Sequence, residues 1–580
     1  MKNALVAKIF YEMADILDIM GENVFRIRAY RRAAQNIENL ARDVEELSPE
    51  ELKKIPGVGA DLAGKIQEII QTGSCKEYEK LKGKSPEGLT MLLSIPGLGP
   101  RTAKLIYDQF RVTDIDALEK LAREHKLKGL PKIKEKTEQK ILKGIEFLKK
   151  GTERKPLYKV RPIALHILQH LKSKAPIKEL AMAGSLRRWK ETVKDIDILA
   201  TSGEPAKVMD AFVAMARVEE VLLKGMTKTS VVYEGVHVDL RVVEEESFGA
   251  AMAYFTGSKA HNIKLREMAV RKGLKLNEYG IFDKDGKRVG GLSEEEIYEI
   301  LGLPFIEPEL REDTGEIEAG LKGKLPTLIK RTDLKGDLHV HSNWSDGVNS
   351  FEQLMDKARK LKFSYLAITD HSKSLAIAKG MNEEKLMDQI KTIEAFNKKA
   401  KGVMLLKGIE VDIKTDGSLD LPDDLLSRLD VVNAAIHSGF KQPREQLTKR
   451  LLSAIKNPFV NIISHTTGRV LGEREPYDID MEEVLKAARE TGTALEINSY
   501  PNRLDLSDAH AKRAKELGIK IAVSSDAHTL GHFDYLDYGI HTARRGWLEK
   551  GDVMNTLDAE GLLKALKEKR KRLAPALASR

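Results

Sequence analysis

Three aspartates in two short apolar stretches have the type and spacing of ligands for divalent metal ions. Asp195 and Asp197 flank Ile196, so on a β-strand both carboxylates point to one side, about 6 to 7 Å apart along the strand, while Ile196 faces the core. A neighbouring strand that contains Asp239 can bring a third carboxylate to the same face. Three hard oxygen donors at this spacing suit two Mg²⁺ ions, which can activate an attacking hydroxyl and stabilise a leaving pyrophosphate.

An isolated Asp-x-Asp is usually a solvated strand edge, but other residues accompany this one. The turn Gly184–Ser185 and the downstream Arg188 precede the aspartates and could hold the phosphates of a nucleotide. A later segment contains Tyr254, Phe255, Gly257, Asn262 and Arg266. The order of these elements resembles the nucleotidyltransferase fold and, more narrowly, the family X DNA polymerases, the family of DNA polymerase beta.

This resemblance implies a role for each matching residue. The catalytic residues that bind the metal ions would be Asp195, Asp197 and Asp239; triphosphate contacts would come from Gly184, Ser185 and Arg188; the sugar and base would meet Tyr254, Phe255, Gly257 and Asn262; and Arg266 would reach toward the template. The chain departs from the family pattern at Trp189 and Lys194, where the better-known members have glycine. We therefore expect the loop beside the triphosphate to have a different shape.

The composition indicates several domains and a polyanionic partner. A chain of 580 residues with 42% hydrophobic residues can form about three to five domains. A net charge of +9 suits nucleic acid as a partner. The single cysteine, Cys75, excludes an internal disulfide and fits a reducing compartment. Because no apolar run is long enough for a signal peptide or a membrane span, a cytoplasmic protein without membrane contact is expected.

Two repeated segments near the N-terminus predict contacts to the DNA backbone. Residues 55–59 and 95–99 share the pattern Ile-Pro-Gly-x-Gly, and each precedes a helical pattern, as in helix-hairpin-helix motifs. Gly57, Gly59, Gly97 and Gly99 would permit a tight turn whose backbone N–H groups bind a phosphate without reading base sequence. The alternative is an ordinary glycine-containing helix connection, which the second copy disfavours. Residues 129–133 are a candidate for a degenerate third copy.

The segment 25–34 resembles the small domain that, in some family X members, removes a 5′-deoxyribose phosphate through a lysine Schiff base. Lys65 falls at the position of that lysine. However, Asp61 and Arg26 replace two lysines of the family pattern. The resemblance favours binding of a 5′-phosphate across a gap over lyase chemistry, and Lys65 as a solvated helix residue is an equal alternative.

The C-terminal part of the chain predicts a barrel with a metal cluster. Nine of the 14 histidines lie after residue 336. Short apolar segments alternate there with helical ones, at 337–341, 365–369, 404–408, 431–435, 460–463, 494–497 and 520–523. Seven β/α units favour a TIM-like (β/α)₇ barrel, and metal-capable residues stand where the strands end, which is where barrel enzymes place catalysis. A lone histidine is more often a core residue, but six at strand ends are not all structural.

These residues resemble the polymerase and histidinol phosphatase (PHP) superfamily, and the resemblance covers residues 334 to about 545. It implies one ion held by His339, His341, Glu410 and Asp526, a second held by Asp346, His371 and His528, and a third held by His437 and His465 with Glu410 bridging. Imidazole and carboxylate ligands suit Zn²⁺ or Mn²⁺, so about three such ions are expected.

We therefore expect a multidomain α/β protein. The predicted parts are a helical 5′-phosphate- and DNA-binding domain at 1–80, a second helix-hairpin-helix domain at 81–152, a nucleotidyltransferase palm at 153–245, an α+β thumb that selects the nucleotide at 246–317, a linker at 318–333 and the PHP barrel at 334–580. The resemblance implies a monomer that binds gapped or primed DNA and dNTPs. Its function would be gap filling in DNA repair, such as base excision repair.

The barrel would act as a metal-dependent 3′→5′ exonuclease, with cleavage at abasic sites as a further expectation. Two alternatives stay open. The barrel could be a small-molecule phosphatase, which its fusion to a DNA-binding polymerase disfavours. The whole chain could also be an inactive scaffold that binds DNA ends, which the complete ligand set disfavours.

Overall fold

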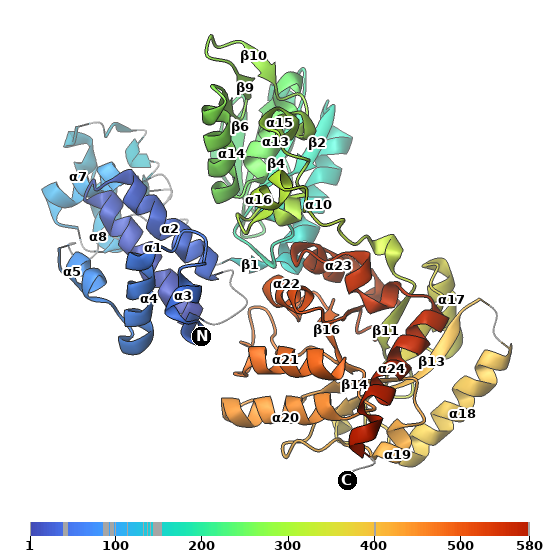
Figure 1. Cartoon of the computed structure of the whole chain (residues 1–580). Helices are drawn as coiled ribbons and strands as arrows, with labels where there is room; N and C mark the ends of the chain where they lie inside the picture. Colours follow the sequence, from blue (N-terminus) through green and yellow to red (C-terminus); the bar gives the residue numbers. More distant parts are fainter. Residues whose placement is uncertain are drawn as a thin grey trace.

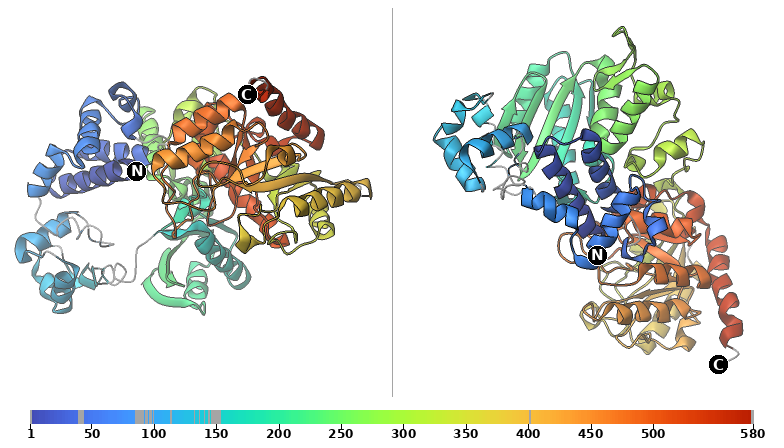
Figure 2. Two further views of the ribbon diagram at one scale, coloured as in Figure 1. Left: turned by 90° about the horizontal axis from the view of Figure 1, so that it is seen from below. Right: turned by 60° about the vertical axis from the view of Figure 1, so that its left-hand side comes forward.

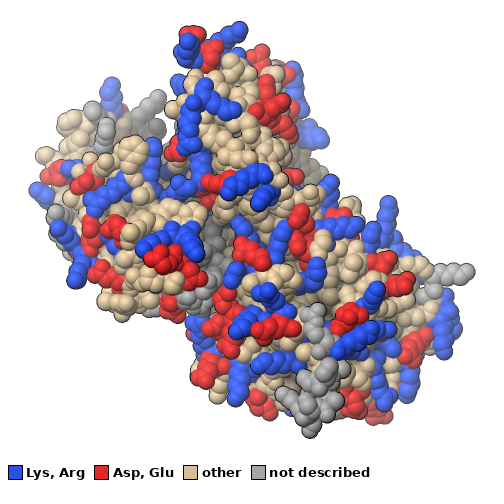
Figure 3. All heavy atoms as spheres, in the orientation of Figure 1, with Lys and Arg blue, Asp and Glu red and all other residues tan. Residues whose placement is uncertain are grey.

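A computed structural model shows three bodies: a helical N-terminal part, a central part built on a mixed sheet, and a C-terminal barrel (Figure 1). It describes residues 2–38, 44–84, 100–112, 114–131, 133–135, 137–139, 141–142, 154–399 and 402–577, together with Leu92, Ile95, Leu98 and Ile145. Within these ranges no helix is long and apolar enough to cross a membrane. On the face shown in Figure 3, basic and acidic side chains are interspersed over all three bodies.

The N-terminal helices enclose two small apolar cores. The first core is formed by α1 (Lys2–Ile19), α2 (Val24–Glu38), α3 (Pro49–Leu52), α4 (Ala60–Thr72) and α5 (Lys76–Lys84). In α1 the buried Ile9, Met13 and Leu17 recur at the spacing of one helix face, which explains the amphipathic helix. A second core contains residues of α7 (Pro100–Phe110) and α8 (Ile115–Arg123).

The same tight turn recurs three times in these helical domains. The N–H of Val58 donates to the carbonyl of Ile55 at 2.9 Å, that of Leu98 to Ile95 at 3.0 Å, and that of Ile133 to Leu130 at 3.1 Å. The third turn lies in the segment 129–133, so this degenerate copy shares the backbone hydrogen bond of the other two.

The central body contains a five-stranded sheet in the order β2-β4-β7-β6-β5. Its strands are β2 (Glu179–Met182), β4 (Asp195–Thr201), β5 (Val218–Lys224), β6 (Lys228–Tyr233) and β7 (Val236–Val243). Strand β7 alternates strictly between buried and partly exposed residues, so one face packs on the core and the other is accessible. The short helix α11 (Gly184–Arg187) joins β2 to the pair β1 (Lys155–Pro156) and β3 (Thr192–Val193), while α10 (Leu157–Lys174) and α12 (Pro205–Val213) complete this palm.

The thumb follows the palm and leads into the barrel. It consists of α13 (Phe248–Thr256), α14 (Lys259–Arg271), a small sheet of β8 (Lys275–Asn277), β9 (Gly280–Phe282) and β10 (Arg288–Gly290), then α15 (Glu294–Leu301) and α16 (Glu316–Leu321). The segment 318–333, expected as a linker, is packed rather than free. It begins inside α16, and Ile329 is buried in the core of the barrel, where its N–H donates to Leu548.

The predicted (β/α)₇ barrel is confirmed. Seven parallel strands follow one another in chain order, namely β11 (Gly336–Val340), β12 (Tyr365–Ile368), β13 (Met404–Asp412), β14 (Val431–Ala435), β15 (Ile462–Ile463), β16 (Ala494–Asn498) and β17 (Ile521–Ser524). A parallel bridge between Val340 and Ala527 brings the first and last strands together. The helices are α17 (Phe351–Lys360), α18 (Glu383–Lys399), α19 (Asp423–Leu426), α20 (Arg444–Lys456), α21 (Met481–Thr491), α22 (Asp508–Glu516), α23 (Leu536–Arg545) and α24 (Ala559–Leu577).

Helix α24 closes the end of the barrel opposite the strand ends that carry the histidines. Its Leu562 and Leu566 are buried in a cluster with Leu338 of β11 and with residues of the other strands. Because this cluster is apolar, the end of the barrel that α24 covers is a packed core and not a channel.

The three bodies contact one another. Figure 1 shows α22 and α23 between the barrel and the palm. The indole of Trp189 stacks on His541 of α23 with ring centroids 3.6 Å apart, and the Arg161 guanidinium lies 3.8 Å from the indole centroid. In the right-hand view of Figure 2 the N-terminal helices lie in front of the junction between the other two bodies. Arg32 contacts Asp313 of the thumb at 3.4 Å on that side.

Two candidate active sites

The palm brings the three predicted aspartates to one face of its sheet. Strands β4 and β7 are parallel neighbours, and their register places Asp197 directly opposite Asp239 and Asp195 opposite His237. Ile196 and Val238 alternate with these residues and are buried in the core. The two-residue period of the strands therefore puts carboxylates on the accessible face and apolar side chains behind them.

Two polar residues of β6, which the sequence analysis did not identify, hold the carboxylate of Asp239. Lys228 Nζ lies 2.7 Å from Asp239 Oδ2, and the Ser230 hydroxyl donates to Oδ1 at 2.5 Å. Burial alone would raise the pKa of Asp239, but these two bonds lower it, so this carboxylate is ionised at neutral pH. Their signal in the sequence is their spacing of two residues, which points both side chains to one face of β6, where Ser230 pairs with Asp239 across the hairpin.

Three carboxylates lie close together on this face of the sheet, so the face is suited to bind a divalent cation. Burial, followed by repulsion from Asp195 and Asp239, raises the pKa of Asp197 to about 7. A bound cation would relieve this repulsion and favour the ionised form of all three groups. The oxygen ligands are those that Mg²⁺ prefers, so the residues fit the ion that the sequence predicts.

The turn at Gly184 lies directly against this site. Gly184 has a φ of +63°, and a Cβ atom at this position would stand 2.3 Å from Asp197 Oδ2. Only glycine lets the backbone approach the carboxylate so closely in this left-handed conformation.

Replacing Gly184 by alanine is therefore expected to displace Asp197 and to reduce nucleotide addition about 100-fold, the effect of moving a catalytic group by about 1 Å. The left-handed conformation adds a stability cost of about 1 to 2 kcal/mol. Primer extension by the purified variant measures the loss. Gly203→Ala is the matched control, since a Cβ there meets nothing within 4 Å. Equal losses in both variants would contradict the role of Gly184.

The predicted nucleotide-contacting residues of the thumb lie on α13 and α14. Tyr254 and Phe255 are in edge-to-face contact with ring centroids 5.1 Å apart. The amide of Asn262 donates to the carbonyl of Tyr254 at 2.6 Å, and Arg266 Nε donates to the carbonyl of Asn262 at 3.3 Å. Arg241, which the sequence analysis assigned no role, joins these rings to the aspartates because its guanidinium lies 4.4 Å from the Phe255 centroid and its charge lowers the pKa of Asp197.

Arg188, predicted to contact a triphosphate, has protein partners in this structure. Its Nε donates to Glu312 at 3.0 Å and its Nη1 to the carbonyl of Thr256 at 2.5 Å. Arg545 of the barrel donates to the same carboxylate of Glu312 at 3.0 Å and to the backbone carbonyl of Arg188 at 2.8 Å. In the loop after the paired arginines, Trp189 has a φ of +53° and its side chain packs on the barrel.

The structure describes one of the two repeated glycine turns in detail. Gly57 has a φ of +84°, as the turn requires, whereas Gly59 has an extended backbone and precedes α4 without a capping side chain. The N–H groups of the first turn of α4 are thus open to a phosphate. Gly97 and Gly99 lie outside the described residues.

Lys65 is buried on α4, and its ammonium group donates to the carboxylate of Asp61 one turn earlier. Burial would lower the pKa of Lys65, but the bond to Asp61 raises it. Since a Schiff base requires a neutral amine, this pairing favours a structural role for Lys65 over lyase chemistry.

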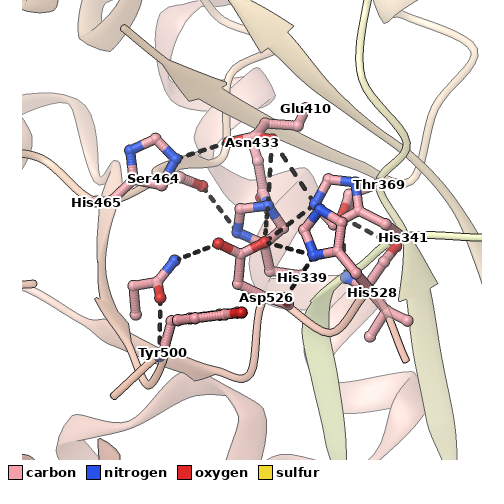
Figure 4. A network of polar contacts seen from close by, with 12 residues as sticks. His339, His341, Thr369, Glu410, Asn433, Ser464, His465, Tyr500, Asp526 and His528 are labelled. Carbon is pink, nitrogen blue, oxygen red and sulfur yellow. Dashed lines mark hydrogen bonds and ion pairs between the residues drawn. The ribbon is translucent and has the colours of Figure 1, made fainter. Parts of the chain in front are cut away.

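The barrel gathers all nine predicted ligands at the carboxyl ends of its strands. Figure 4 shows His339, His341, Glu410, His465, Asp526 and His528 of this set. Ligand atoms close enough to share an ion form three groups: His339, His341 and Asp526; His341, Asp346, His371 and His528; and His371, Glu410 and His437. Compared with the predicted sets, His341 and His371 each belong to two groups. The remaining ligand, His465, has its Nε2 2.9 Å from Glu410 Oε1.

Glu410 stands at the centre of this metal cluster. Its Oε1 lies 3.4 Å from His437 Nε2 as well as close to His465, while its Oε2 lies 2.9 Å from His371 Nδ1 and 3.4 Å from His339 Nε2. The two oxygens thus face different groups of imidazoles, so each could be a ligand of a metal ion.

The histidines have the properties of metal ligands. Buried ring nitrogens without a hydrogen-bond partner include His341 Nδ1. Burial and the neighbouring His371 lower the pKa of His341 to about 3, so this imidazole stays neutral, as a metal ligand must be. Unsatisfied donors and acceptors of this kind are costly unless an ion engages them, so the residues fit the Zn²⁺ or Mn²⁺ that the sequence predicts.

Two carboxylates behind the ligands were not identified from the sequence. Glu496 Oε1 lies 2.7 Å from His339 Nδ1, and Asp412 Oδ1 lies 2.7 Å from His437 Nδ1. Such contacts fix the ring orientation and leave the opposite nitrogen for a metal ion. Asp412 ends β13 two positions after the ligand Glu410, and Glu496 is a buried acid in the middle of β16, which is the signal that could have found them.

Comparisons with known proteins place these two sites in a family context. Family models match residues 1–75 (Helix-hairpin-helix domain), 89–146 (SAM-like Helix-hairpin-helix tandem), 251–312 (DNA polymerase beta thumb) and 337–536 (PHP domain). The chain is 38% identical over 567 residues to the DNA polymerase/3′-5′ exonuclease PolX of Bacillus subtilis (strain 168), covering 96% of this chain and 99% of that protein. It is also 32% identical over 250 residues to a probable phosphatase of Thermoanaerobacter sp. (strain X514), covering 41% of this chain and 96% of the relative.

Proposed function

Since the chain belongs to the family X DNA polymerases that carry a PHP domain, we propose that it fills short gaps in DNA during repair and trims 3′ ends in its barrel. It is a DNA-directed DNA polymerase and 3′-5′ exonuclease. The palm adds nucleotides, the PHP barrel hydrolyses the phosphodiester, and the helix-hairpin-helix turns hold the DNA backbone.

The observation that carries the polymerase proposal is the register of β4 and β7. It sets Asp197 opposite Asp239, with the Gly184 turn in contact with Asp197. In this arrangement the aspartates face the site where a primer hydroxyl and a triphosphate would meet. Lys228 and Ser230 keep Asp239 ionised and fixed. Two Mg²⁺ ions, when bound, would supply activation of the hydroxyl and neutralisation of the leaving pyrophosphate.

In the barrel, a cluster of imidazoles around central carboxylates supports hydrolysis of a phosphodiester. His339, His341 and Asp526, with Glu410, would hold one ion, and the other ligands would hold two more. Bound Zn²⁺ or Mn²⁺ would supply a water molecule with a lowered pKa. Glu496 and Asp412 orient their histidines, so the ligand set is fixed before substrate arrives.

A second candidate function for the barrel is hydrolysis of a small phosphomonoester, because relatives at 32% identity carry the name probable phosphatase. A contact between bodies favours the nuclease instead. The barrel and the palm share the Trp189–His541 stack and the Arg545–Glu312 ion pair, so the metal cluster is held beside a polymerase.

Gap filling is tested by comparing nucleotide incorporation on a one-nucleotide gap with a 5′-phosphate, the same gap without the phosphate, and an open primer-template. We expect kcat/KM to be about tenfold higher on the phosphorylated gap, equivalent to about 1.4 kcal/mol of transition-state binding. Equal efficiency on all three would contradict the repair role. Turnover of single-stranded oligonucleotides should likewise exceed that of phosphomonoesters, and the reverse order would favour the phosphatase.

A further inference from the structure

The palm reaches the loops of the metal cluster through one glutamate. Glu191 follows Trp189 in the loop that packs on α23, so the stack of Trp189 on His541 fixes this loop against the barrel. Glu191 Oε2 lies 2.8 Å from Nη2 of Arg469. Arg469 belongs to the barrel and is buried, whereas the Glu191 side chain is 39% exposed at the boundary. Glu191 of the palm thus faces the buried guanidinium of Arg469 in the barrel.

Arg469 joins two loops of the barrel. Its Nε donates to the carbonyl of Arg503 at 3.0 Å, and its Nη2 donates to the carbonyl of Leu504. Arg469 itself lies in the loop after β15, and the two carbonyls lie in the loop after β16. A further bond between these loops runs from the N–H of Thr467 to Asp505 Oδ2 at 2.9 Å. The guanidinium is therefore a clamp whose charge is neutralised in part by the palm.

Both clamped loops are attached to metal-capable residues. His465 begins the first loop, with a φ of +28°, a conformation that needs support from its surroundings. At the base of the second loop, the Asn498 amide donates to Asp526 Oδ2 at 3.0 Å, and the Asn498 N–H donates to the carbonyl of Asp505 at 2.6 Å. A shift of the loops would move His465 directly and Asp526 through Asn498.

We propose that Glu191 of the palm is a positioning residue for the nuclease centre and acts through Arg469. By neutralising the buried guanidinium, Glu191 holds the two loops in the arrangement that places His465 and Asp526 in the metal cluster. The inference deepens the proposed function and rests on the barrel being the nuclease. It also means that the palm helps to hold the loops of the nuclease site in place.

The test is Glu191→Gln in the full chain, which removes the charge and keeps the side-chain shape. We expect kcat for 3′→5′ degradation of a single-stranded oligonucleotide to fall about tenfold with KM unchanged, the lower end of what loss of a residue behind metal ligands costs. The Mn²⁺ content of the purified variant should be lower than that of the wild type. Primer extension should be unchanged, because the Glu191 side chain contacts Arg469 of the barrel.

Glu204→Gln is the matched control, since Glu204 is a palm glutamate that pairs with Lys207 at the solvent side. It should leave degradation, extension and metal content unchanged. In a double-mutant cycle, Glu191→Ala combined with Arg469→Ala should lose no more degradation than Arg469→Ala alone, as expected for residues that act as a unit. If Arg469→Ala does not fold, the two Glu191 variants provide the test. The kcat for degradation and the metal content should then fall in both Glu191→Gln and Glu191→Ala.

Unchanged kcat and metal content in both Glu191 variants would overturn the inference. An equal loss of primer extension would also overturn it, because the effect would then be a general disruption of the palm. Failure of the proposed function is distinguishable, since degradation that persists after removal of the central ligand Glu410 would place the nuclease elsewhere.

Discussion

Replacing Glu410 by alanine is expected to eliminate 3′→5′ degradation while primer extension continues. Both oxygens of Glu410 face imidazoles, with His465 and His437 on one side and His371 and His339 on the other. Its loss removes the negative charge at the centre of the cluster and should cost the barrel at least one of about three ions. Degradation of a labelled oligonucleotide should fall about 100-fold or more, beyond what changes behind the ligands cause.

The control for this variant is Glu394→Ala, because Glu394 is an exposed glutamate of the barrel that pairs with Lys407 at 3.1 Å. It should retain full degradation and metal content. Glu410→Gln removes the negative charge but keeps the side-chain shape, and this variant should also be inactive in 3′→5′ degradation. Degradation at the wild-type rate by a metal-depleted Glu410→Ala protein would remove the nuclease from the barrel.

Asp239→Ala is expected to abolish templated nucleotide addition with little effect on DNA binding. Asp239 stands opposite Asp197 and is the carboxylate that Lys228 and Ser230 hold ionised. Without it, the remaining pair cannot hold two ions, and we expect the rate of addition to fall about 1,000-fold or more, at least the effect of losing a group that stabilises transition-state charge. Single-turnover primer extension measures the loss, and gel-shift titration with gapped DNA measures binding.

Asp210→Ala is a suitable control, since Asp210 is an exposed palm aspartate paired with Lys224 at 2.6 Å. The same Asp239→Ala protein should still degrade 3′ ends, because the ligands of the barrel lie in a different body. Normal incorporation by Asp239→Ala would exclude the aspartates as the polymerase centre, and Asp195→Ala should behave in the same way.

The periodicity of apolar residues and the order of the strands in the sequence were sufficient to predict which strands carry the two sites. The alternation around Ile196 and Val238 determines which face of the palm carries the aspartates, and this follows from strand geometry alone. In the barrel, ligands such as His371 and His437 follow buried strands, and parallel strands end at one edge, so their meeting point could also be predicted.

The supporting residues could not be predicted because their roles depend on partners that only the tertiary structure supplies. Glu496 and Asp412 are ordinary strand acids in the sequence, and their roles depend on the contacts with His339 and His437. Arg188 fits the phosphate contact of a family pattern, yet its pairing with Glu312 depends on how the thumb meets the palm. Trp189 was only a departure from the pattern until α23 was seen to cover it.

The closure of the barrel by β11 and β17 has a consequence for how the two sites arise during synthesis. The aspartates of the palm come from β4 and β7, which both lie between residues 195 and 243, so their site can form as soon as β7 has left the ribosome. The metal cluster takes His339 and His341 from the first barrel strand and Asp526 and His528 from beyond the last. The barrel cannot close until β17 is made, so β11 has an unpaired edge until then. Contacts so distant in sequence form slowly. The growing chain therefore acquires a complete set of polymerase carboxylates well before it can assemble a nuclease.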